Sequence, residues 1–160
     1  MGIAKTWGLP ESLRMVMQTA LQALPLRRVV FCVRDPQTQL ISGRLGLGEA
    51  VVPWLNGIAI NLKPAPGSVP DLFTAICMAG ADTVIDNIQD PRFLQRLPAW
   101  FGPPPPTVSL LLLPLVIKRE TVALFYADSL VPGGLRLGDH KLALLRTLRN
   151  QAVMALRARD

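Results

Sequence analysis

Apolar residues recur near the start of the chain at the spacing of one helix face, at positions 13, 16, 17, 20, 21 and 24. Polar residues at positions 14, 18 and 22 fall on the opposite side. Pro10 suits the first turn of such a helix, and Pro25 stops it because a proline ring cannot continue the helical backbone. The pattern predicts an amphipathic helix that ends before Pro25.

The next part of the chain predicts short strands. Arg28–Arg34 and Leu40–Leu47 are rich in β-branched and other apolar residues and are separated by a proline-containing turn, which indicates a hairpin. Prolines and glycines then break residues 50 to 70 into short pieces, of which only 58–62 is typical of a strand. Asp71–Gly80 predicts a short helix and Thr83–Asp86 a brief strand. A hairpin directly after a helix excludes an all-helical bundle.

The clearest prediction is a second hairpin, formed by Val108–Ile117 and Thr121–Tyr126. Its first strand is apolar without alternation, so we expect both faces of the sheet to be covered. Residues 87 to 106 read as a loop-rich segment whose four closing prolines make a stiff surface loop inside one domain, residues 1 to 160. Asp139 is placed to cap a last helix, which runs from His140 to about Arg157.

Composition fits one folded domain. The chain has 160 residues, of which 50% are apolar and 18% charged, and its mean hydropathy is +0.34, which excludes a disordered chain. The longest apolar run, Val108–Ile117, is shorter than the roughly 20 residues of a membrane helix, so we expect no membrane contact. Two cysteines far apart in sequence give no disulfide framework, which favours the reducing cytoplasm. The net charge of +6 is concentrated in residues 136 to 160 rather than spread over a face, which makes nucleic acid an improbable partner.

Candidate catalytic residues are few. His140 is the only histidine, and its place at the start of a helix favours a solvated residue over a catalytic base. Cys32 and Cys77 lie in apolar segments, where a free thiol is usually a small core residue and less often a reactive one. We therefore expect no catalytic residue, no metal site and no cofactor.

Several segments resemble the GAF domains of regulatory proteins. Ser109–Lys118 carries the Pro-Leu pair of a GAF strand, Thr121–Asp128 resembles the strand that follows it, and Leu144–Leu156 resembles the closing helix with its Gln-Ala pair. The likeness covers roughly residues 10 to 157. It implies an α+β fold of the GAF/PAS type: a mostly antiparallel sheet with terminal helices on one face and short helices and loops on the other. Ala123 stands where GAF domains most often carry glycine, and the Asn-Lys-Phe-Asp signature of cyclic-nucleotide binding is not recognisable.

A narrower likeness concerns GAF-type regions that follow HDOD signalling domains in bacteria. Four segments carry it: Arg44–Gly48, Asp71–Thr74, Leu97–Trp100 and Phe125–Asp128. This resemblance implies an HDOD or another signalling domain as a partner.

Aromatic residues gather in the irregular middle of the chain, which the GAF resemblance makes the lid of a ligand pocket. A pocket for a small molecule is mostly apolar with a few polar groups. The candidate pocket residues are Arg44, Phe73, Asp86, Phe93, Arg96, Trp100, Tyr126 and Asp128. The resemblance also implies a homodimer through the terminal helices, with Leu145, Leu148, Ala152 and Leu156 as candidate interface residues.

Three functions remain open at this point. The first is a non-catalytic sensory domain of bacterial signal transduction that binds a small molecule and signals through dimerising helices. The second is a scaffold that dimerises without a ligand. The third is a redox enzyme that uses Cys32 or Cys77.

Overall fold

The computed structural model describes residues 2–4, 15, 18, 22, 24–104 and 108–157 of the chain. Its centre is a seven-stranded sheet in the order β1-β3-β2-β7-β6-β5, with β4 paired to β3, and every pairing is antiparallel. The strands are β1 Gly2–Ala4, β2 Arg28–Arg34, β3 Leu40–Gly48, β4 Ala59–Asn61, β5 Thr83–Ile85, β6 Ser109–Ile117 and β7 Glu120–Ser129.

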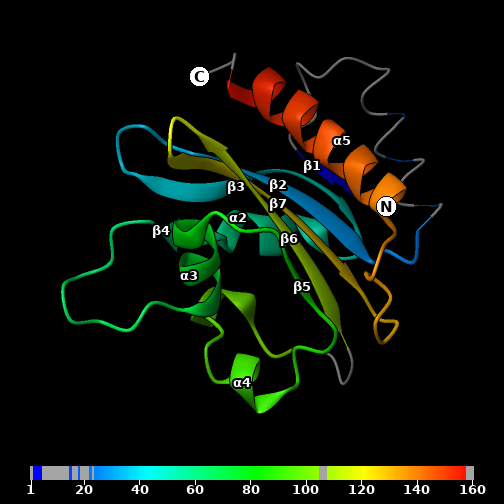
Figure 1. The fold of residues 1–160 in the computed structure, drawn as a ribbon, viewed down its shortest axis with the longest axis horizontal. Helices are drawn as coiled ribbons and strands as arrows, with labels where there is room; N and C mark the ends of the chain where they lie inside the picture. Colours follow the sequence, from blue (N-terminus) through cyan, green and yellow to red (C-terminus); the bar gives the residue numbers. More distant parts are fainter. Residues whose placement is uncertain are drawn as a thin grey trace.

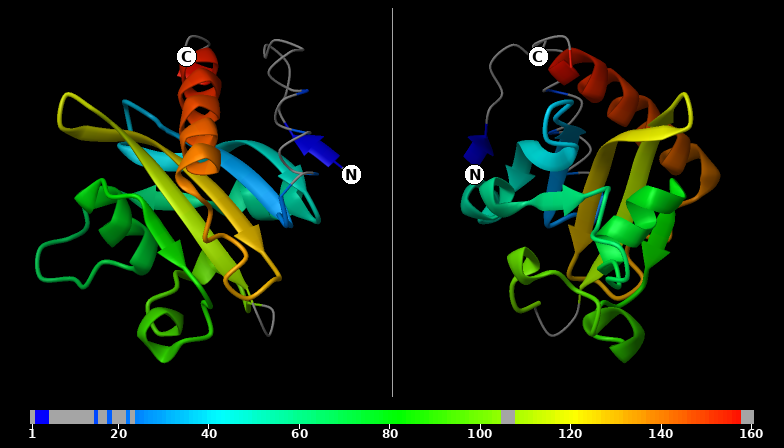
Figure 2. Two further views of the ribbon diagram at one scale, coloured as in Figure 1. Left: turned by 45° about the vertical axis from the view of Figure 1, so that its right-hand side comes forward. Right: turned by 90° about the vertical axis from the view of Figure 1, so that its left-hand side faces the viewer.

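Helices cover both faces of this sheet. They are α2 Val51–Gly57, α3 Leu72–Ala79, α4 Pro91–Leu94, the 3-10 helix η1 Ala99–Phe101, and α5 Asp139–Arg157. Figure 1 shows α5 lying across one face, with the short helices on the other, and the views in Figure 2 agree. We call these the α5 face and the short-helix face. This is the predicted α+β architecture of the GAF/PAS type.

The hairpin of β6 and β7 lies inside the sheet and is buried on both sides. Leu110 and Leu112 pack on the short-helix face, whereas Leu111 and Leu113 pack on the α5 face, and all four are fully buried. Successive side chains of a strand point to opposite faces, so an apolar run without alternation requires two covering layers. The predicted double burial of these strands is confirmed.

The glycines of β3 let a helix approach the sheet closely. A Cβ atom built at Gly43 would lie 2.5 Å from Leu55 Cδ1 of α2, and one at Gly46 would lie 2.7 Å from Val51 Cγ2. Both distances are shorter than real Cβ contacts, so a side chain at either position would push α2 away. These glycines therefore serve the packing of α2 on β3.

Several elements differ from the predictions. Helix α2 was not predicted, because Pro53 and Gly57 read as breaks; Pro53 instead lies in the first turn, where a proline costs no hydrogen bond. Strand β1 was also missed, and the loop-rich segment contains α4 and η1. Asp139 is the first residue of α5 rather than a residue before it. The predicted first helix lies outside the described residues, apart from positions 15, 18 and 22, which are helical.

The predicted dimer residues of the last helix lie inside the fold. Leu145, Leu148 and Ala152 are buried in the cluster on the α5 face, against the sheet of the same chain. This corrects the prediction, because a residue packed on its own sheet cannot also face a second copy. The side chain of Leu156 lies outside the described residues.

The arginines of α5 also bind their own sheet. Arg146 forms an ion pair with Asp82 at 2.7 Å, beside β5, and Arg149 donates to the backbone oxygen of Pro114 at 3.0 Å. These contacts tie α5 to β5 and β6. Every helix in the described part of the chain is too short or too polar to span a bilayer.

Candidate functional site

Five aromatic side chains meet on the short-helix face. They come from four elements, and we call them the aromatic cluster: Trp54, Phe73, Trp100, Phe101 and Tyr126. Ring centroids are 4.9 Å apart for Trp54 and Tyr126 and 5.0 Å apart for Phe73 and Trp100. Such tilted pairs add to the stability gained from burial alone. The cluster joins the sheet to the loop-rich segment that covers it.

The segment above the cluster, residues 86–104, is held in place by backbone hydrogen bonds. The N–H of Leu72 donates to the oxygen of Arg96 at 2.8 Å, and the N–H of Ile88 donates to the oxygen of Val108 at 2.9 Å. Trp54 Nε1 donates to the oxygen of Phe101 at 3.0 Å. We call residues 86–104 the cover segment. It is fastened to α3, to the residue before β6 and to α2, and it contains little regular structure of its own.

Asp128 lies beside the aromatic cluster in a buried ion cluster. Its carboxylate accepts hydrogen bonds from Arg27 Nε at 2.9 Å, Arg27 Nη2 at 2.7 Å, Arg28 Nε at 2.9 Å and the Tyr126 hydroxyl at 2.6 Å. The Asp128 side chain is fully buried, and that of Arg28 is 9% exposed. We define Arg27, Arg28, Tyr126 and Asp128 as the ion cluster. Its carboxylate has its acceptor sites filled by protein donors.

The electrostatics of the ion cluster follow from burial and pairing. The hydrogen bond to Asp128 raises the pKa of Arg27, and burial raises the pKa of Tyr126 well above its ordinary value. Tyr126 therefore stays protonated and donates to the carboxylate. The guanidinium carbon of Arg28 lies 3.7 Å from the ring centre of Trp54, a cation–π contact. This contact joins the ion cluster to the aromatic cluster.

Trp100 carries an unused hydrogen-bond donor. Among the described residues, its Nε1 is the only buried side-chain nitrogen or oxygen without a hydrogen-bond partner. A buried donor that is left unpaired costs about 1–3 kcal/mol, so native proteins rarely retain one without an acceptor. The N–H belongs to the cover segment and to the aromatic cluster. It can serve an acceptor supplied from outside the protein.

The structure brings part of the predicted pocket together. Phe73, Trp100 and Tyr126 belong to the aromatic cluster, and Phe93 packs at its margin as a partly buried side chain. Asp128 is adjacent, but its carboxylate is directed at Arg27 and Arg28, so its role there is to hold the strand ends together.

Three predicted pocket residues lie elsewhere. Arg44 lines a hollow of about 360 Å³ with Val33, whose side chain packs on the α5 face. Asp86 pairs with Arg136 at the surface, and the hydrogen bond from that arginine lowers the pKa of Asp86. Arg96 is exposed and donates to the backbone oxygen of Pro70 at 3.4 Å. Arg44 is misplaced because a bulge shifts the register of β2 and β3 at Phe31/Cys32.

Sequence reasoning missed the two arginines of the ion cluster. Arg27 directly precedes β2 and Arg28 is its first residue, and this β-branched strand is almost wholly buried. A charged side chain at the end of a buried strand needs a partner of opposite charge, so the sequence could have predicted a buried ion pair at this position. The acids at 82, 86 and 90, which recur every fourth residue, each pair with a different arginine: Arg146, Arg136 and Arg92.

Neither cysteine has the surroundings of a reactive thiol. Cys32 and Cys77 are both buried on the short-helix face. Burial raises the pKa of Cys77 to about 12 and raises that of Cys32 further above its ordinary range. A thiolate is the nucleophilic form, so both thiols are poorly suited to attack. No group of three His, Cys, Asp or Glu side chains in the described ranges is arranged to hold a metal ion.

Comparison with solved structures shows the same fold in signalling and enzymatic proteins. The GAF domain of an Acinetobacter phosphoenolpyruvate-protein phosphotransferase matches with a TM-score of 0.67 and 15% identity, over 92% of this chain and 81% of that one. The GAF domain of a Bacillus halodurans two-component sensor histidine kinase matches with a TM-score of 0.62 and 14% identity, over 94% and 95%.

A free methionine-R-sulfoxide reductase from Neisseria meningitidis, solved in complex with its substrate, matches with a TM-score of 0.61 and 14% identity, over 91% of this chain and 76% of that one. At these identities the likeness establishes the fold alone. A search of the curated proteins finds no match. The family model described as GAF domain matches residues 8–156, which is nearly the whole sequence. With its two-sided antiparallel sheet and its covered aromatic face, the chain belongs to the GAF domain family.

Proposed function

We propose that this GAF domain is one non-catalytic regulatory unit of bacterial signal transduction that binds a small molecule beneath the cover segment. The observation that carries the proposal is the Trp100 Nε1–H, a buried donor without a partner inside an aromatic cluster. A ligand with a flat ring and a hydrogen-bond acceptor would supply the missing acceptor and stack on the neighbouring rings.

Binding would bias the domain by favouring one position of the cover segment. A ligand shifts an equilibrium only by its differential affinity for the two states. An acceptor that reaches Trp100 Nε1 fulfils this condition, because it removes the cost of an unpaired buried donor only while the cover segment lies over the aromatic cluster as it does in the structure. The cover segment is also fastened to α2 through Trp54 and Phe101, so its position is linked to the packing of α2 on the sheet.

The state of the thiols and of His140 supports a non-catalytic role. Both cysteines are buried with raised pKa values, and His140 is exposed at the start of α5, on the face of the sheet opposite the aromatic cluster. The redox alternative requires a reachable thiolate. Burial of both thiols counts against it.

The output proposed is a cytoplasmic homodimer that uses the outward side of α5. Leu144 is 54% exposed and Met154 is 59% exposed, and they lie on one stripe of the helix with Thr147 and Gln151 between them. This stripe replaces the buried residues of the sequence prediction as the contact between copies. The resemblance of Arg44–Gly48 and Leu97–Trp100 to HDOD-associated regions makes an HDOD domain the proposed partner.

Thermal-shift screening with nucleotides and small aromatic metabolites, followed by NMR of the tryptophan indole signals, tests the ligand. We expect a stabilising compound to shift the Trp100 Nε1–H resonance. The Trp100→Phe variant keeps an aromatic ring but loses the donor, so it should bind the same compound more weakly. If no compound raises the melting temperature and the Trp100 signal never moves, the ligand proposal is wrong and the dimerising scaffold remains.

Sedimentation tests the output separately. A homodimer that Leu144→Glu converts to a monomer agrees with the proposed interface. A monomeric wild type contradicts both the dimer and the scaffold alternative.

A further inference from the structure

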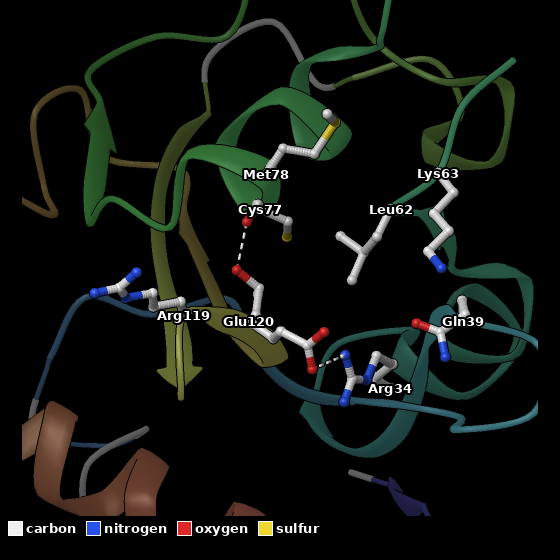
Figure 3. Close-up of a pocket in the computed structure, with 9 residues that line it drawn as sticks. Arg34, Gln39, Leu62, Lys63, Cys77, Met78, Arg119 and Glu120 are labelled. Atoms are coloured by element: carbon white, nitrogen blue, oxygen red, sulfur yellow. Dashed lines mark hydrogen bonds and ion pairs between the residues drawn. The ribbon is translucent and has the colours of Figure 1, made fainter. Parts of the chain in front are cut away.

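A pocket lies where the turn between β6 and β7 meets the end of β2. It has a volume of about 260 Å³. Figure 3 shows Cys77 and Met78, both from α3, on one side of the pocket. Leu62 lies on the adjacent side, and Arg34 and Glu120 lie opposite α3. We call it the hairpin-end pocket.

This pocket is separate from the aromatic cluster. Arg28, in the ion cluster, and Arg34, in the pocket, are the first and last residues of β2. A strand of this length spans about 20 Å, which separates this pocket from the ion cluster. None of the residues that line the pocket belongs to the aromatic cluster, although Phe73 stands one turn before Cys77 on α3. The buried Cys32 and Ile60 belong to the core on the same face of the sheet.

Positive charge prevails around the hairpin-end pocket. Arg34, Lys63 and Arg119 line it, against one acid, Glu120. Arg34 donates to Glu120 through a single contact of 3.3 Å, and the Glu120 side chain is 67% exposed. Within the described ranges, Lys63 and Arg119 have no ion pair. An incoming acid group can therefore replace Glu120 at Arg34 and meet the free charge of Lys63.

The other donors in the pocket are already used, which narrows where an acid group can bind. The Thr121 hydroxyl donates to the backbone oxygen of Cys77 at 2.5 Å, and Gln39 Nε2 donates to the oxygen of Pro36 at 3.0 Å. The guanidinium of Arg119 is directed away from the labelled group in Figure 3. Arg34 and Lys63 are left as the two cations that face the pocket.

The apolar walls give the ligand a second requirement. Leu62 is partly buried against the core. Met78 follows the last buried residue of α3, Cys77, and its side chain is 53% exposed. A methionine side chain is flexible and adapts to irregular apolar shapes. Covering Leu62 and Met78 with a short hydrocarbon would remove apolar surface from water.

The backbone around the pocket is held in an unfavourable conformation. Four described residues other than glycine have positive φ, and three of them lie here: Gln39 at 64°, Lys118 at 52° and Arg119 at 68°. A two-residue hairpin turn with two positive φ values normally uses Asn-Gly, because other side chains cost about 1–2 kcal/mol each. Such strain is concentrated at functional sites, and here it coincides with the basic pocket.

We propose that the hairpin-end pocket binds a small organic anion, with the acid group between Arg34 and Lys63 and a short hydrocarbon part against Leu62 and Met78. The site is independent of the ligand proposed beneath the cover segment. It gives the domain a second input at the opposite end of β2.

The test uses hexanoate as the probe and the amide signals of the full chain in NMR as the readout. We expect saturable shifts at Arg34, Leu62, Lys63, Met78 and Glu120. Two further probes separate the contributions: hexanamide keeps the chain and removes the charge, and acetate keeps the carboxylate and removes most of the chain. Each should bind at least about tenfold more weakly than hexanoate. A loss of that size corresponds to one or two contacts made near the surface, the charge contact for one probe and the hydrocarbon contact for the other.

Matched variants complete the test. Lys63→Gln should weaken hexanoate binding about three- to fivefold, the range for a charge contact near water. Lys141→Gln removes the same charge from an exposed position of α5 and should leave hexanoate binding unchanged, as should Trp100→Phe. The proposal is overturned if hexanoate gives no saturable shift, if hexanamide or acetate binds as tightly, or if Lys63→Gln and Lys141→Gln behave alike.

Discussion

Replacing Asp128 by alanine should destabilise the fold more than any other single change of a charged residue described above. The carboxylate is fully buried and accepts four hydrogen bonds, two from Arg27, one from Arg28 and one from Tyr126. Asp128→Ala leaves the Arg28 guanidinium, with only 9% of its side chain exposed, without its counter-ion. Breaking a buried ion pair from one side costs about 3–5 kcal/mol, and we expect a loss in unfolding free energy of that size.

Urea unfolding followed by tryptophan fluorescence measures this loss, because Arg28 lies on the ring of Trp54. In the Asp128→Ala background, Arg28→Met should recover part of the stability, since it removes the unpaired charge. Asp86→Ala is the matched control: its carboxylate also pairs with an arginine but at the exposed surface, and its change should be far smaller. A loss below about 1 kcal/mol for Asp128→Ala, the size of a surface pair, would refute the account of the ion cluster.

Three further predictions concern the core. Burial raises the pKa of Cys77 from 9.0 to about 12, so the stability that its protonated thiol contributes is complete below pH 9 and falls as pH rises. Between pH 8 and pH 10 the unfolding free energy should drop by about 1.4 kcal/mol more in the wild type than in Cys77→Ala. Urea titrations at both pH values measure this difference. Gly43→Ala should lower the melting temperature by displacing Leu55 of α2, whereas an unchanged calorimetric transition would mean that α2 does not touch β3 there. Leu145→Ala should cost about 2–5 kcal/mol in chemical unfolding because its side chain is buried, while Leu144→Ala, at an exposed site, should weaken only self-association in sedimentation.

Most of the fold could be predicted from the sequence, because the strongest patterns in it depend on neighbouring residues alone. Leu110 to Leu113 are apolar without alternation, which demands layers on both faces, and the structure has both. Asp71 and Gly80 flank α3 as the N-cap and the left-handed C-cap, as expected of these residue types. Helix α2 escaped prediction because its stability comes from contact with Gly43 and Gly46, a tertiary effect that its own proline and glycine conceal.

The candidate site was only partly accessible from the sequence. Phe73 and Trp100 are large apolar residues of the irregular middle segment, Tyr126 lies in the second predicted hairpin, and the three side chains do meet. Arg44 could not be placed, because one bulge in β3 changes the face to which later side chains point. Charged partners are a matter of long-range geometry: Asp128 and Arg27 are 101 residues apart, and no local pattern joins them.

The alternation along β7 has a mechanical consequence. Tyr126 touches the aromatic cluster, while the adjacent Phe125 packs on Phe31, at 5.1 Å between ring centres, within the group of residues beneath α5. The distance between the two environments is thus a single peptide unit, and that unit is rigid and planar. A rotation of this strand as a rigid body would therefore move both rings together and would be felt on both faces of the sheet.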